Sequence, residues 1–166
     1  MTIHGSTVHS LVPFKAIPYF NKRSNMSVEY FRRPGPGGLD CEATGFSNTV
    51  VLPANARVVI TAGQAGINIE TNQLVTSSPE AQIEAAFDCL DAALKTAGVS
   101  NGLASAYKVT SYLTDPRYDS LMMEIWRRRC PGHRPIWASV GSHVLVLPGM
   151  IIELQAEAVL PATARL

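Results

Sequence analysis

The sequence has 166 residues, of which 46% are hydrophobic and 16% charged, and its formal net charge is +1 at pH 7. This length suits one domain with a sizeable core, and the low charged fraction indicates that an oligomer covers part of the surface. The small net charge argues against a nucleic-acid partner, which usually meets a basic face. Because no apolar run reaches membrane-spanning length and no signal-peptide core opens the chain, we predict a cytoplasmic protein without a membrane partner.

Residues 1–40 contain four prolines and the segment RRPGPGG. We therefore predict an irregular N-terminal extension ahead of a single domain over residues 41–166. The runs Val50–Leu52 and Arg57–Thr61 are rich in β-branched residues and flank the turn-forming segment PANA. This pattern predicts a hairpin-like pair of strands.

Two helices alternate with three further strands. Ser78 as N-cap, Pro79 at the first position and Gly98 beyond the end predict the first helix. A strand is predicted over residues 104–114 and a second helix from about residue 119 to residue 129. The last two strands are expected at 136–140 and 150–160, the latter alternating between apolar and polar residues. The predicted fold class is α+β, a mixed sheet with two helices on one face.

The three cysteines, Cys41, Cys89 and Cys130, have no metal-ligand spacing and cannot all pair. Their number favours a reducing compartment, and we predict no metal site. Cys130 with His133 can be interpreted as a nucleophile and its base, although a small buried residue beside a loop histidine is the interpretation we favour. The basic run Arg127–Arg129 is interpreted as a helix end, where cations complement the helix dipole.

Five segments in a fixed order resemble the Rid family, the YjgF/YER057c/UK114 group. They are VVITAGQAGI at 58–67, LKTAG at 94–98, YKVTSYLTDPR at 107–117, RPIWASVG at 134–141 and IIELQAEAV at 151–159. The best-known members are enamine/imine deaminases. The resemblance implies a chorismate-mutase-like fold, a barrel-forming homotrimer with ligand clefts between subunits, and neither metal nor organic cofactor.

The resemblance also implies site residues. The deaminases hold the carboxylate of an imino acid with an arginine in an RPARS motif, and they use a glutamate and water for hydrolysis. Here the arginine position is Trp137 and the glutamate position is best matched by Glu153. The usual tyrosine, serine and asparagine positions are Phe46, Ala62 and Met123. Further substrate-binding candidates are Gly63 and Gln155, and further catalytic candidates are Ser139, His143 and Tyr112.

These replacements share one direction, because polar groups give way to apolar ones. An indole cannot reproduce the two parallel hydrogen bonds of a guanidinium to a carboxylate. We therefore expect a pocket for an apolar small-molecule substrate, in which Glu153 moves a proton, Trp137 and Phe46 stack on the substrate, and Ser139 or Tyr112 binds its oxygen. The alternatives are that Trp137 packs at a subunit interface and that Glu153 is a solvated strand residue.

Three functions remain open. The first is an enzyme of fungal secondary metabolism, a role implied by the resemblance, that isomerises, cyclises, dehydrates or hydrates an apolar carbonyl compound. The second is a deaminase whose carboxylate clamp has moved to Arg134 or Arg117. The third is a ligand-binding or chaperone-like trimer without catalysis.

Overall fold

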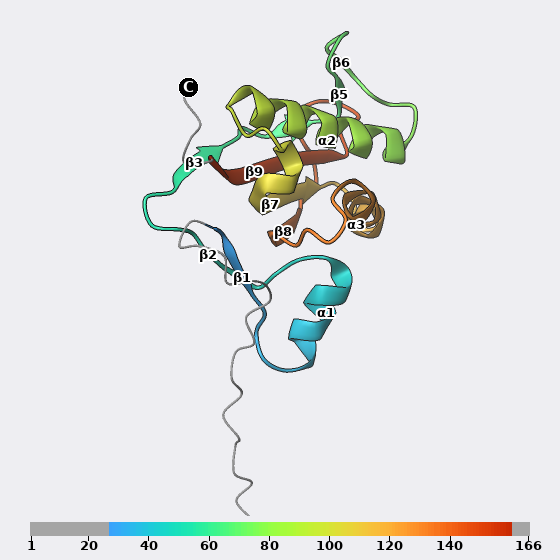
Figure 1. Ribbon diagram of the computed structural model, residues 1–166. Helices are drawn as coiled ribbons and strands as arrows, with labels where there is room; N and C mark the ends of the chain where they lie inside the picture. The colour runs from blue at the N-terminus through green and yellow to red at the C-terminus, as the bar shows by residue number, and fades with distance from the viewer. Residues whose placement is uncertain (1–26, 161–166) are drawn as a thin grey trace, which may run out of the picture.

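A mixed β-sheet forms the centre of the computed structural model, which describes residues 27–160 (Figure 1). Its strand order is β3-β9-β7-β8, formed by Arg57–Ile60, Ile152–Leu160, Ala106–Leu113 and Ile136–Gly141. Strand β7 pairs antiparallel with β9 and parallel with β8, while the short strand β4 (Gln64–Ala65) also pairs with β9. The predicted α+β class is confirmed.

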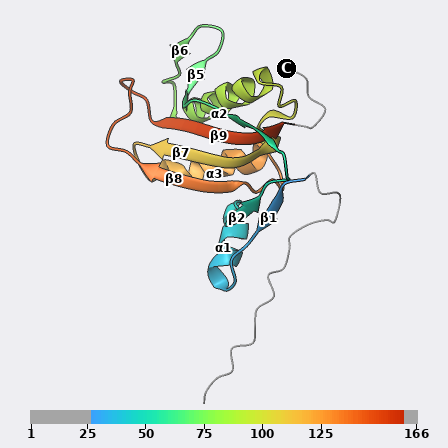
Figure 2. The same ribbon diagram turned by 90° about the vertical axis from the view of Figure 1, so that its left-hand side faces the viewer.

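Helices α2 (Pro79–Thr96) and α3 (Tyr118–Arg129) both lie behind the sheet in Figure 2. The predicted start of α2 is confirmed, because the Ser78 hydroxyl accepts a hydrogen bond from the Ala81 amide at 3.1 Å. The helices cover one face of the sheet, and the short hairpin of β5 (Ile67–Asn68) and β6 (Gln73–Leu74) projects beyond α2. Within the described chain, no helix is long and apolar enough to cross a membrane.

Strand β9 shows how the alternating sequence builds the core. Ile152 and Leu154 are completely buried beneath the helices, whereas Glu153 and Gln155 lie half-buried on the opposite face. Strand β7 follows the same alternation. Tyr112 is directly opposite Glu153 in the β7-β9 register, so both side chains lie on the face opposite the helices. The sheet therefore has a helix-covered face and an open face, and the register assigns each side chain to one of them.

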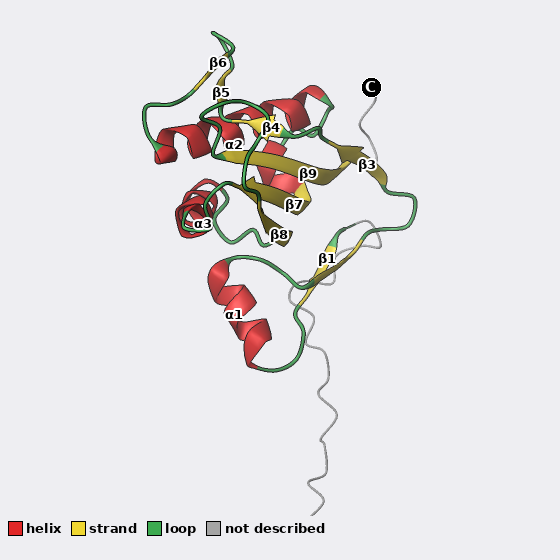
Figure 3. Ribbon diagram, turned by 180° about the vertical axis from the view of Figure 1, so that it is seen from behind, coloured by secondary structure: helices red, strands yellow, loops and turns green. Residues whose placement is uncertain are grey.

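The N-terminal extension is not irregular throughout. Residues Glu29–Phe31 form strand β1, and Pro36–Thr44 form helix α1, which lies below the sheet in Figure 3. Proline suits the first turn of a helix, and Gly45 closes α1 in the left-handed region at a φ of 103°. The prolines and glycines, from which we predicted an irregular segment, thus mark the start and the end of a helix. The domain boundary near residue 41 stays a prediction, and residues 1–26 lie outside the described chain.

The predicted hairpin is wrong, although its turn is correct. The Ala56 amide donates to the Pro53 carbonyl at 3.2 Å, as expected for a tight turn at PANA. However, β2 (Thr49–Val51) pairs with β1, and β3 pairs with β9. A turn signal fixes only the local bend, whereas pairing depends on which distant strand offers free backbone groups. Likewise β7 begins at Ala106, because Gly102–Ser105 form a 3₁₀ helix.

His133 packs in an aromatic cluster beside the end of α3. Its ring lies 6.0 Å from that of Tyr30 and 5.8 Å from that of Trp126, and its Nε2 atom is 2.7 Å from the Ala106 carbonyl oxygen. Burial lowers the pKa of His133, and the hydrogen bond to Ala106 opposes this only in part. The fold therefore favours the neutral imidazole, which donates from Nε2.

The stability of the protein is expected to fall as the pH drops below about 6.5. The unfolded chain binds a proton at the ordinary histidine pKa, whereas the folded chain resists until the lowered pKa of His133 is reached. Between these two values the unfolded state binds more protons, so the free energy of unfolding decreases with falling pH. Urea unfolding at a series of pH values should show a smaller decrease for His133→Gln than for the parent. His143→Gln, at an exposed loop position, is the control; equal slopes for parent and His133→Gln would contradict the assignment.

Candidate functional site

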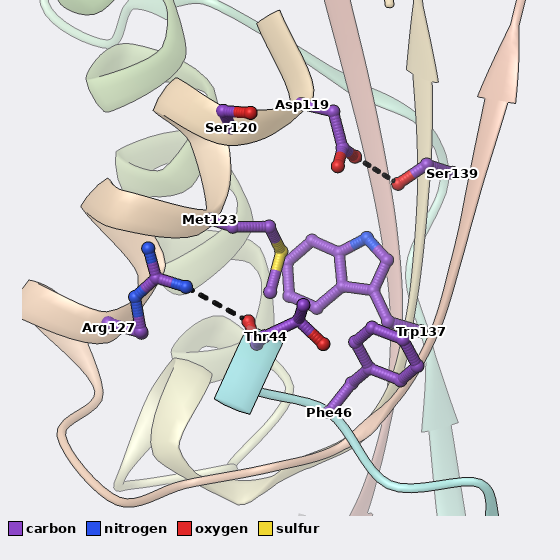
Figure 4. Close-up of a pocket in the computed structure, with 8 residues that line it drawn as sticks. All are labelled: Thr44, Phe46, Asp119, Ser120, Met123, Arg127, Trp137 and Ser139. Carbon is purple, nitrogen blue, oxygen red and sulfur yellow. Dashed lines mark hydrogen bonds between the residues drawn. The ribbon is translucent and has the colours of Figure 1, made fainter. Parts of the chain in front are cut away.

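A cavity of about 370 Å³ lies between α3, strand β8 and the end of α1 (Figure 4). Aromatic rings from Phe46 and Trp137 and the thioether of Met123 form its apolar part. The cavity is lined by Thr44, Phe46, Asp119, Ser120, Met123, Arg127, Trp137 and Ser139. The structure thus brings together four residues predicted from the sequence, namely Phe46, Met123, Trp137 and Ser139.

Helical and strand periodicity explain why these side chains meet. Asp119, Met123 and Arg127 are four residues apart on α3, so they share one helix face. Trp137 and Ser139 are two apart on β8 and therefore point to the same side of the sheet. Asp119 and Arg127 were missed in the sequence. Their spacing from Met123 is the signal that could have found them.

A chain of hydrogen bonds runs along one wall of the cavity. The Trp137 indole Nε1 donates to the Ser111 hydroxyl oxygen at 3.1 Å, and Ser111 donates to the Ser139 hydroxyl at 3.1 Å. Ser139 in turn donates to Asp119 Oδ1 at 2.6 Å. Ser111 is completely buried, so the chain connects the sheet interior to a carboxylate at the cavity wall.

Arg127 supplies the positive charge in the cavity. Its Nη1 atom donates to the Thr44 carbonyl at the end of α1, at 3.1 Å. Arg128 and Arg129, by contrast, form ion pairs with the α2 carboxylates Glu84 and Asp88. Among the side chains that the structure describes, no carboxylate forms an ion pair with Arg127. Its remaining N–H groups are available to an anionic ligand group.

Glu153 lies on the open face of the sheet and not in this cavity. It faces Tyr112 across the β7-β9 pair and packs against Gly63, where a Cβ atom would lie 1.7 Å from Glu153 Oε1. Gln155, on the same face, donates to the Thr61 carbonyl at 2.9 Å, and Ala62 is exposed. Gly63 thus leaves the space that the carboxylate occupies. A pocket in which Glu153 lies beside Trp137 is not formed within one chain, because the two side chains point to opposite faces of the sheet.

Three other predicted residues lie apart from the cavity. His143 is exposed in the loop between β8 and β9. Neither Arg117 nor Arg134, the expected alternative carboxylate clamps, lines the cavity, and Arg117 forms an ion pair with Asp115 at 2.5 Å. The arginine at the cavity is Arg127 instead.

Cys130 has no features of a nucleophile. Burial raises the pKa of its thiol to about 11, which disfavours the reactive thiolate. Its neighbour His133 is held by the Ala106 carbonyl. Among the described residues, no group of three histidine, cysteine or acidic side chains is arranged to hold a metal ion.

The family model of endoribonuclease L-PSP matches residues 41–160. The chain belongs to the endoribonuclease L-PSP family. A Rid-family protein of Yersinia pestis, YyfB, is 24% identical, with 70% of this chain and 88% of that chain covered and a TM-score of 0.61. A protein described as an endoribonuclease of Thermotoga maritima is 30% identical over 70% of this chain and 87% of its own, with a TM-score of 0.57. Yeast Mmf1 is 24% identical over 70% and 87%, with a TM-score of 0.56.

The resemblance to the Rid group predicted from the motifs is confirmed by these matches. No curated protein matches the chain. The match to the endoribonuclease L-PSP family begins at Cys41, so it contains Thr44 and Phe46 at the cavity but not strand β1 or the start of α1. The family region therefore includes every residue that lines the cavity.

Proposed function

We propose that this protein is a cofactor-free enzyme that moves a proton on a flat, apolar, carbonyl-containing small molecule. The cavity between α3 and β8 carries this proposal, because it combines an apolar wall with a polar pair. Trp137, Phe46 and Met123 offer the surface on which a ring can stack. The Ser139–Asp119 pair, joined at 2.6 Å, is the group that can accept a proton.

In the proposed step, the Ser139 oxygen takes a proton from the substrate while its own proton passes to Asp119. The bonding electrons stay on the substrate as an enolate. Return of a proton to a different substrate atom completes an isomerisation, and Asp119 regains its charge. Dehydration or cyclisation would begin with the same proton removal. A biosynthetic role in fungal secondary metabolism and a cytoplasmic location remain part of this proposal, and the three free cysteines support the latter.

Deuterium exchange tests the proposal without knowledge of the natural substrate. The protein is incubated in deuterated water with phenylpyruvate and a panel of cyclic ketones, and NMR follows deuterium uptake at the carbon beside the carbonyl. Protein-dependent exchange above the buffer rate supports proton transfer in the cavity. If phenylpyruvate and the panel bind but none exchanges, the protein is a ligand-binding member of its family and not this enzyme.

Arg127 favours a second candidate, an enamine/imine deaminase with a relocated carboxylate clamp. A guanidinium without an ion-pair partner among the described side chains suits a carboxylate. Ammonia release from 2-iminopropionate, generated in situ, tests this candidate. Loss of that activity in Arg127→Gln, but not in Arg117→Gln, would assign the clamp.

We also propose that the protein is a homotrimer with no nucleic-acid partner. The open face of the sheet carries exposed apolar side chains on its edge strands, with exposed fractions of 40% for Val58, 63% for Ile60 and 42% for Val140. Exposed apolar side chains on both edges of one sheet face favour contact with another protein surface.

Sedimentation equilibrium at micromolar concentration is expected to give three times the chain mass of 17.9 kDa. Ile60→Glu should shift the mass toward the monomer, because it places a charge on the open face. Ile69→Glu on the β5-β6 hairpin, at a side chain that is 58% exposed, is the matched control. If the parent protein is a monomer, both the proposed trimer and any site shared between subunits are ruled out.

A further inference from the structure

We infer that the cavity selects a ring compound that presents an O–H or N–H donor to Ser139, because the hydrogen-bond chain Trp137–Ser111–Ser139–Asp119 has only one possible direction. This inference rests on the proposed function, because it takes the substrate to bind in the cavity. It adds the chemical class of the group that the polar wall recognises, and it makes Ser139 and Asp119 specificity-determining residues.

The two ends of the chain fix its direction. An indole N–H can only donate, so Trp137 must give its hydrogen to Ser111. A carboxylate can only accept, so Ser139 must give its hydrogen to Asp119. The hydroxyl of Ser111 then has one hydrogen left to offer, and it points to Ser139 at 3.1 Å. Each hydroxyl has a single hydrogen, so none remains for the ligand.

Ser139 consequently faces the cavity as an acceptor. Its hydrogen is committed to Asp119, and one of its lone pairs accepts the hydrogen of the Ser111 hydroxyl. The second lone pair is left for a ligand. Asp119 offers further acceptor positions on its oxygens. The sequence predicts that Ser139 or Tyr112 binds the oxygen of the substrate; with its hydrogen committed to Asp119, Ser139 can bind that oxygen only as the acceptor of an O–H group. A ligand that offers only a carbonyl to this wall would leave both groups unpaired, at a cost in affinity.

The fixed direction also accounts for the indole at the position where the family's arginine is expected. Trp137 lies half-buried, and its N–H is anchored on the completely buried Ser111. The anchor fixes the indole at the cavity wall, while the far end of the chain presents acceptors. An enol, a phenol or an enamine N–H therefore matches the wall better than the corresponding ketone or imine.

Two matched probes test the direction, 3-hydroxybenzoate and 3-fluorobenzoate. Both carry a ring for Trp137 and a carboxylate for Arg127, but only the hydroxyl can donate. Calorimetric titration of the full-length protein should show about tenfold tighter binding of the hydroxyl probe, as expected for one hydrogen bond to a charged or polarised acceptor. In Ser139→Ala the ratio of the two dissociation constants should fall to within about twofold. Ser100→Ala, at an exposed position outside the cavity, should keep the tenfold ratio.

Asp119→Asn provides a second arm that preserves size. An amide can donate to Ser139, which frees the Ser139 hydrogen for the ligand, so the preference for the hydroxyl probe should disappear. An unchanged ratio in both cavity variants, or failure of the parent to bind either probe at millimolar concentration, would overturn the inference. If the protein discriminates between the two probes but catalyses no deuterium exchange, the inference stands and the proposed catalysis is ruled out. Failure of the inference can therefore be distinguished from failure of the proposed function.

Discussion

Asp119→Asn is expected to lower the rate of deuterium exchange by about 10²- to 10⁴-fold, the usual contribution of a general base. The amide keeps the shape of the side chain but cannot take the proton of Ser139. Binding of a ring compound should change far less, because Trp137 and Phe46 supply the apolar contacts. The measurement is the initial exchange rate at saturating substrate, taken with the dissociation constant from calorimetry.

Two further carboxyl-to-amide changes show whether the effect is specific. Glu124→Gln, at an exposed position on the same helix, should leave the exchange rate within about twofold of the parent. Glu153→Gln tests the competing assignment, because the sequence predicts Glu153 as the acid or base. If Glu153→Gln abolishes exchange and Asp119→Asn does not, the base is Glu153, and the open face of a second subunit must complete the site.

The order of β3, α2, β7, α3, β8 and β9 could be predicted because local signals decide it, whereas β1, α1 and the short strands β4 to β6 were not predicted. Ser78 and Pro79 set the start of α2, and the alternation of β9 assigns Ile152 and Glu153 to opposite faces. Strand pairing could not be predicted in the same way. The register of β3 against β9 joins residues about a hundred positions apart, and no local pattern around residue 57 specifies that partner.

The candidate site was predicted in part, for a related reason. Phe46, Met123, Trp137 and Ser139 were placed together because the motif order carries the family's site positions with it. Asp119 escaped notice because a first-turn carboxylate is usually explained by the helix dipole. The separation of Glu153 from Trp137 follows from the registers of β9 and β8 against β7, which only the folded sheet specifies.

Trp126→Ala is expected to lower the free energy of unfolding by about 3–5 kcal/mol, the usual loss for a large buried aromatic residue. Trp126 is completely buried, with its ring 5.9 Å from Phe87 and 5.0 Å from Trp137, and its Nε1 donates to the His133 carbonyl at 3.3 Å. The cavity left behind would also leave that carbonyl without its partner. Because domains of this size have about 5–15 kcal/mol in total, a large fraction of the folded-state stability would be lost.

Urea unfolding followed by circular dichroism measures this change without relying on the tryptophan that is removed. Trp137→Ala is the comparison, because its indole is only half-buried and faces the ligand cavity. It should cost clearly less stability than Trp126→Ala but should weaken ring binding, since the stacking surface is gone. The two indoles touch, so the double variant should deviate from additivity by about 0.5–3 kcal/mol. Equal stability losses in the two single variants would mean that Trp137 belongs to the core and that the cavity needs another wall for its ligand.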